Sequence, residues 1–239
     1  KESKMSEYDV TYAGETARSH DIYIVQRPDI PAPEINRDQI DIPGRDGSLY
    51  LSQRTVNDIQ ISIEMNFMTT PNQWGEKYRE AKAWLLKEQN GVLKMNDDPE
   101  WFYRAKKVVI ETSERTCRQI GKFIATFTCS GYMYRVDGAT SHTIEEVQRN
   151  NWEECHPTYL IKGDANCRLK VNGKYFVVNV GQECTIDTER QIAYKSDGTL
   201  VNAYVTGDYE DLYLKTGGNT IEITPETMTM EIIPNWRCY

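Results

Sequence analysis

A tight reversal of the chain is predicted by one stretch, Ile40-Asp41-Ile42-Pro43-Gly44-Arg45-Asp46-Gly47-Ser48-Leu49-Tyr50-Leu51. Pro43-Gly44 opens the turn and Asp46-Gly47 closes it, and these residue types are the ones that β-turns favour. Arg45 and Asp46 place opposite charges at the tip, and charges in a surface turn are commonly only solvated. The runs on either side have strand character, so the stretch predicts two strands joined by a short, exposed turn.

Strand signals continue after this turn. From Ile59 to Phe67 apolar and polar residues alternate with a period of two, which predicts an antiparallel strand with one buried face. The apolar positions of this strand are Ile59, Ile61, Ile63, Met65 and Phe67. Residues 102 to 110 and 122 to 134 predict further strands. Together they form a sheet long enough for another element to pack on.

One clear helix is predicted over residues 71 to 89. Thr70 is the expected N-cap with Gln73 completing a capping box, and Asn90-Gly91 supplies the stop. An apolar stripe of core-packing character comprises Trp74, Tyr78, Ala81 and Leu85, with Trp84 beside it. The expected solvated face comprises Glu76, Lys77, Arg79, Glu80, Lys82 and Lys87.

Residues 27 to 34 differ from the strands in composition, because they contain prolines at 28, 31 and 33. Proline lacks a backbone donor and favours extended backbone, so this segment is not expected inside a sheet. The simplest interpretation is a surface loop.

A domain boundary is predicted near Gly138, where small and polar residues follow the last aromatic strand of the first half. The expected domains are residues 1–138 and 139–239. In the second, Asn172-Gly173 predicts a type I′ hairpin and Ser196-Asp197-Gly198 another turn. Further strands are predicted at residues 221 to 223 and 228 to 233, and this regular succession of short strands and turns is typical of an antiparallel sandwich.

The composition restricts the function classes. The 239 residues suit two domains of about 100 to 140 residues each. The chain has 36 acidic and 28 basic residues, for a net charge of −8, without a basic block, which disfavours nucleic-acid binding. No apolar run approaches the roughly 20 residues that span a bilayer, and the first residues lack a signal core. We expect a soluble protein made in the cytoplasm. Residues 1 to 4 precede Met5, which favours their being an addition to the natural sequence.

Metal binding and catalysis find little support. None of the six cysteines forms a Cys-x-x-Cys pair, and the three histidines, His20, His142 and His156, offer few further ligands. Cys155 and His156 are adjacent, so in a strand they point to opposite faces. Cys129 continues the buried alternation, and free thiols are expected throughout. No nucleophile elbow, P-loop or dinucleotide fingerprint occurs, and the acidic pairs Asp97-Asp98 and Glu153-Glu154 are expected by chance. We expect no enzyme, cofactor or metal.

The pattern Ile-x-x-Pro-Gly-Arg-Asp-Gly-x-Leu at residues 40–49, followed by an alternating strand and a Trp-bearing helix, resembles the distal tail proteins of phages with long non-contractile tails. In the second half, the order Asn172-Gly173, Asp197-Gly198, Gly217-Gly218-Asn219-Thr220-Ile221 and Pro234-Asn235-Trp236 resembles their galectin-like or carbohydrate-module-like sandwich. The resemblance covers most of the chain.

The resemblance implies a mainly β protein with two domains. The first is a tail-tube-like domain with one packed helix, and the second is the sandwich. It also implies a hexameric hub in the virion tail of a phage or prophage, synthesised and assembled in the bacterial cytoplasm. This hub would join the tail tube protein to the tail tip protein and adsorption machinery, including a receptor-binding protein. Distal tail proteins use an extended arm to wrap a neighbouring subunit, which here would involve Pro28, Ile30, Pro31 and Pro33.

Two alternatives stay open. The chain could be another tail component, such as a tube subunit. The second domain could bind a host cell-wall glycan, because sugar sites need aromatic faces, and Trp152 and Trp236 would then be the contacts. A galectin-like scaffold does not by itself carry the function of galectins.

Overall fold

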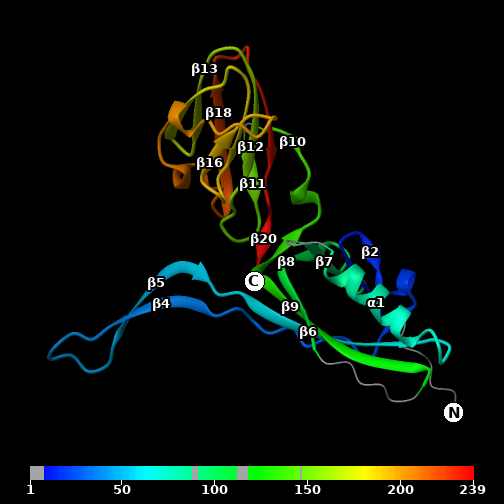
Figure 1. Cartoon of the computed structure of the whole chain (residues 1–239). Helices are drawn as coiled ribbons and strands as arrows, with labels where there is room; N and C mark the ends of the chain where they lie inside the picture. The colour runs from blue at the N-terminus through cyan, green and yellow to red at the C-terminus, as the bar shows by residue number, and fades with distance from the viewer. Residues whose placement is uncertain (1–7, 88–90, 112–117, 146) are drawn as a thin grey trace. The chain divides into compact units, whose positions relative to one another are not determined.

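The computed structural model describes residues 8–87, 91–111, 118–145 and 147–239 (Figure 1). The predictions made for residues 1 to 4, Gln89, Asn90 and Cys117 lie outside these residues. The chain divides into two compact units, the first running to Met133 and including Tyr239, the second formed by Tyr134–Cys238. Strands dominate both units, which confirms the predicted mainly β fold class.

The first unit is built on an antiparallel sheet. Its strands lie in the order β2 (Glu15–Thr16), β1 (Val10–Tyr12), β7 (Gly91–Met95), β8 (Trp101–Ile110), β9 (Ile120–Arg135), β6 (Ile59–Met68) and β3 (Ile22–Ile24). The predicted alternation in β6 is confirmed, because every second residue from Ile59 to Phe67 is buried in the first core. Cys129 on β9 lies in the same core, as predicted, and burial raises the pKa of its thiol to about 12.

The helix α1 spans Trp74–Leu85 and is shorter than predicted. Gln73, not Thr70, is the N-cap, and the Thr70 hydroxyl lies 2.7 Å from the Gln73 side-chain oxygen. The residues between them form a turn before the helix begins, so the expected capping box does not form. Gly91 is also not a helix stop but the first residue of β7.

The face of α1 that covers the sheet is close to the predicted stripe. Ala81, Trp84 and Leu85 are buried, and Trp74 and Tyr78 pack partly buried against the first core. Two residues assigned to the solvated face need correction. Lys77 is mostly buried and pairs with Asp21 and Glu80, and half-buried Lys82 lies over the Tyr78 ring at 4.7 Å.

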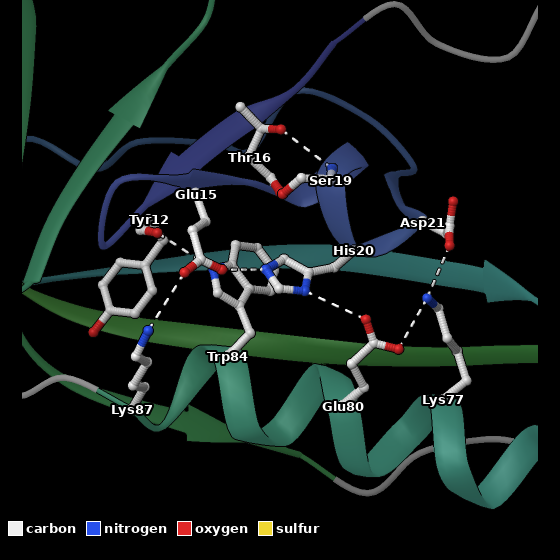
Figure 2. Close-up of polar contacts among 10 residues, drawn as sticks. All are labelled: Tyr12, Glu15, Thr16, Ser19, His20, Asp21, Lys77, Glu80, Trp84 and Lys87. Carbon is white, nitrogen blue, oxygen red and sulfur yellow. Dashed lines mark hydrogen bonds and ion pairs between the residues drawn. The ribbon is translucent and has the colours of Figure 1, made fainter.

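A network of aromatic and charged side chains fixes α1 to the segment before β3 (Figure 2). His20, the last residue of the 3-10 helix η1 (Ala17–His20), stacks on Trp84 with ring centroids 4.9 Å apart. Its Nε2 lies 2.6 Å from the carboxylate of Glu15 and its Nδ1 3.5 Å from that of Glu80. The hydrogen bond from His20 lowers the pKa of Glu15. Trp84 Nε1 donates to the Tyr12 carbonyl at 3.3 Å, so one indole links the helix to η1 and to β1.

The second unit is an antiparallel sandwich. One sheet has the order β10 (His142–Thr143), β19 (Thr229–Ile233), β12 (Thr158–Gly163), β15 (Gln182–Asp187) and β16 (Ile192–Tyr194). The other has the order β11 (Val147–Asn150), β18 (Gly217–Thr224), β13 (Asn166–Val171), β14 (Lys174–Asn179) and β17 (Val205–Thr206). Both sheets contribute to the second core, which includes Tyr159, Leu169, Phe176 and Ile186. The remaining short elements are η2 (Asp137–Ala139), η3 (Asn202–Tyr204), η4 (Tyr209–Leu212) and β20 (Arg237–Cys238).

Two predicted motifs have clear structural roles in this sandwich. Asn172 and Gly173 have φ angles of 50° and 84°, which confirms the type I′ turn between β13 and β14. Asn219 is fully buried, and its amide nitrogen donates to the carbonyls of Lys215 and Gly217 at 2.7 and 3.2 Å. Its side-chain oxygen accepts from Lys215 N at 2.9 Å and from the Asn172 amide at 2.8 Å. The buried amide of Asn219 therefore links residues 215–217 to Asn172 in the turn between β13 and β14.

Candidate assembly interface

The stretch of residues 40–51, with which the sequence analysis began, forms a hairpin, as predicted. β4 (Ile35–Ile40) and β5 (Leu49–Val56) make a separate antiparallel two-stranded sheet, which Figure 1 shows as a distinct ribbon. The loop residues 41 to 47 are all exposed, and Gly44 and Gly47 have φ angles of 82° and 78°. The Arg45 backbone N–H donates to the Ile42 carbonyl at 3.1 Å, so Arg45 lies at the tip of a defined turn.

Apolar side chains gather on one face of the hairpin, near its loop. Ile40 pairs with Leu49, and two residues further along β5 lies Leu51, so these three side chains share one face. Ile42 follows at the start of the loop. Ile40 and Ile42 are each 41% exposed and Leu51 is 48% exposed, which is unusual for large apolar residues that lie together. We call Ile40, Ile42, Leu49 and Leu51 the apolar hairpin patch.

The other face carries a polar cluster. Gln39 donates to the Ser48 hydroxyl at 2.8 Å, and Ser48 donates to the Asp41 carboxylate at 2.6 Å. These hydrogen bonds, that from Ser48 foremost, lower the pKa of Asp41. The cluster ties the two strands together where the loop begins. An isolated hairpin is only marginally stable in water, so a hairpin with an uncovered apolar side is suited to docking on another surface.

A cleft of about 440 Å³ lies elsewhere in the first unit. Its apolar lining comprises Ile30, Met95, Trp101, Tyr103 and Met133, and its charged lining comprises Arg27, Asp29, Asp97 and Asp98. Arg27 Nε lies 2.5 Å from Asp97 Oδ2, and the Tyr8 hydroxyl donates to Asp97 Oδ1 at 3.1 Å. The hydrogen bond from Arg27 is the main reason that the pKa of Asp97 is lowered. The cleft thus combines aromatic walls with acidic groups.

The proline-rich segment lies outside every strand, as predicted. Pro28 is buried, and Ile30 packs against the first core of its own chain, while Pro31 is exposed and Pro33 is half-buried. The segment borders the cleft through Asp29 and Ile30. Its assignment as the arm that wraps a neighbour stays a prediction.

The candidate glycan contacts are poorly placed for that role. Trp236 is 8% exposed and belongs to the second core, and Trp152 is partly buried against the same core. Arg135 lies over the Trp152 ring at 5.6 Å. Tyr175 and Tyr204 are much more exposed. The glycan role of the two tryptophans stays a prediction that their burial does not favour.

The described residues contain no group of three or more metal-ligating side chains, and no helix among them is long and apolar enough to cross a membrane. The cysteines at 129, 155, 167, 184 and 238 are free thiols. His156, considered above as a partner of Cys155, instead stacks on Tyr213 with ring centroids 3.9 Å apart and lies beside Arg237.

No protein-family model matches this chain, and no curated protein sequence is similar to it. Among solved structures, the chain is similar to the crystal structure of SPP1 Dit (gp 19.1) protein, described as a paradigm of the hub adsorption apparatus in phages that infect Gram-positive bacteria. The TM-score is 0.70 at 12% sequence identity, over 95% of this chain and 98% of that chain. This likeness confirms the predicted resemblance at the level of the fold, across both units.

Proposed function

We propose that this protein is a structural distal tail protein of a phage or prophage. In this role it forms a hexameric hub that joins the tail tube protein to the tail tip protein and the adsorption apparatus. The observation that carries the proposal is the similarity in fold to a phage hub protein over 95% of this chain and 98% of that one. Because both units are matched, a hub is favoured over a tube subunit.

The hairpin is the main structural support for a ring. A closed ring needs heterologous contacts, in which one surface of each copy meets a different surface of the next. The apolar hairpin patch is such a surface, because it is exposed in the single chain and would be buried by a neighbour. Among the described residues β4 and β5 pair only with each other, so their outer edges add main-chain donors and acceptors that a neighbour can satisfy.

The second unit completes the proposal. We assign the sandwich, galectin-like by resemblance, to contacts with adsorption machinery such as a receptor-binding protein. Glycan binding is a weaker candidate because Trp152 and Trp236 are held against the core. We assign the protein a structural and not a catalytic role, in the virion tail, after synthesis and assembly in the bacterial cytoplasm.

Labelling of tails tests this function. Antibodies raised against the second unit, coupled to gold and imaged on intact particles, should mark the junction between tail tube and tail tip. Label spread along the tube would support a tube subunit, and particles without label would remove the protein from the mature tail.

A further inference from the structure

We propose that Arg45, at the tip of the hairpin, docks into the acidic, aromatic-walled cleft of the neighbouring copy, between Asp29 and Asp98. This inference rests on the proposed ring and names the residues that would join its copies. It also gives a role to the turn motif formed by Pro43, Gly44, Arg45, Asp46 and Gly47.

The cleft has acidic groups that lack a cation. Among the described residues, Asp97 is paired with Arg27, but neither Asp29 nor Asp98 has a basic group within ion-pair distance. Both line the same cleft as Trp101 and Tyr103. Carboxylates beside aromatic rings suit a guanidinium group, which donates charge-assisted hydrogen bonds to carboxylates from its edge and stacks on rings with its face.

Arg45 is the matching cation. It forms no ion pair within the described part of the chain, and it is exposed at the most protruding point of the hairpin. The positive φ angles of Gly44 and Gly47, on either side of the Arg45-Asp46 pair, allow the sharp turn that presents this side chain.

The length of the hairpin fits a contact between copies. From Ile35 to Arg45 the chain advances ten residues, or roughly 33 Å if extended. A domain of about 125 residues has a radius of gyration of about 14 Å, so the tip can reach past the edge of one copy to the next. Each copy supplies one hairpin tip and one cleft. In a closed head-to-tail ring every tip is therefore docked and every cleft is occupied.

A charge swap in the full chain tests the docking. Arg45→Glu and Asp98→Arg should each raise the concentration at which assembly is half complete, by about tenfold for loss of one charge-assisted contact. The double variant R45E/D98R should recover most of this loss, because the two charges are exchanged and still opposite. Arg37→Glu, an equal charge change on an exposed strand position of the same hairpin, is the matched control and should have little effect. Sedimentation velocity gives the assembly state, and unchanged melting midpoints show that the variants are folded.

Cross-linking identifies the occupant of the cleft. In Arg45→Lys, a carbodiimide should join residue 45 to Asp98 or Asp29, and a mixture of isotope-labelled and unlabelled chains should show that the link joins two copies. A link within one chain, or none at concentrations where the chain assembles, would overturn the proposal. Normal assembly of R45E, or equal loss in R37E, would overturn it while leaving the ring intact. If the chain neither assembles nor cross-links at any concentration, a second copy is not the occupant of the cleft. The gold-labelling experiment then decides separately whether the protein is part of the tail.

Discussion

Replacing three of the four residues of the apolar hairpin patch with serine should strongly weaken ring assembly without unfolding the chain. The chosen change is Ile40→Ser, Ile42→Ser and Leu51→Ser together, in residues that are 41%, 41% and 48% exposed in the single chain. Full burial of such a side chain contributes about 1.5 to 3 kcal/mol. The exposed fraction therefore leaves about 0.6 to 1.4 kcal/mol per residue to be gained at an interface. The three changes together should cost about 2 to 4 kcal/mol, or roughly 30- to 900-fold in affinity.

The assay is sedimentation velocity over a dilution series, with thermal unfolding as the check on folding. Since these side chains face solvent in the single chain, the melting midpoint should change little. Val147→Ser with Leu200→Ser is the matched control, because both residues are exposed and apolar but lie in the second unit. If the control weakens assembly as much as the triple variant, or if the triple variant assembles normally, the hairpin is not the ring contact.

Four further predictions concern the folded units. Leu85→Ala should destabilise the first unit by about 2 to 5 kcal/mol in denaturant unfolding because it leaves a cavity under α1, whereas exposed Arg79→Ala should cost under about 0.5 kcal/mol. Asn219→Ala leaves buried donors and acceptors unpaired and should cost about 2 to 4 kcal/mol, seen as a lower melting midpoint of the second unit. The pKa of Asp97 is lowered, so its pair with Arg27 stabilises the fold above about pH 4, and this stabilisation is lost as the pH falls through the folded-state pKa. Asp97→Asn should therefore lower the melting midpoint at pH 7 and make the midpoint depend less on pH in acid. Independent folding of domains 1–138 and 139–239 is a proposal for limited proteolysis, which should cut between residues 136 and 154 and release two folded pieces.

The strands were the most predictable part of the fold. The alternation of apolar and polar residues in β6 predicts burial directly, because every second residue faces the first core. The Asn172-Gly173 turn was predictable for a different reason, since few residue pairs accept two positive φ angles. Both signals are local, and no distant partner overrides them.

The ends of α1 were not predictable from capping residues alone. Pro71 looked like a first helical residue, but the turn before Gln73 delays the helix, and Leu86 ends it before the expected stop. Gly91 has a packing role instead, because a Cβ there would lie 2.6 Å from the Tyr12 ring. That contact joins residues far apart in the sequence, as does the stack of His20 on Trp84, and neither leaves a local pattern.

The candidate interface was predicted in part. The Pro-Gly-Arg-Asp-Gly turn indicated an exposed tip, but the resemblance assigned the arm to the proline-rich segment, whose lack of backbone donors suits extended backbone. The hairpin itself was predicted, but its apolar side was not, and the pairing of β4 with β5 shows why. Its apolar side appears only when residues from both strands are placed in register, since neither strand alternates strictly along its own sequence.

Electron microscopy of the purified chain tests the central claim most directly. At concentrations where sedimentation shows assembly, class averages should show closed rings with six-fold rotational symmetry and a central channel, and the serine variant of the hairpin should show none. Open filaments, a different symmetry, or rings that persist in the serine variant would contradict a hexameric hub joined through its hairpins.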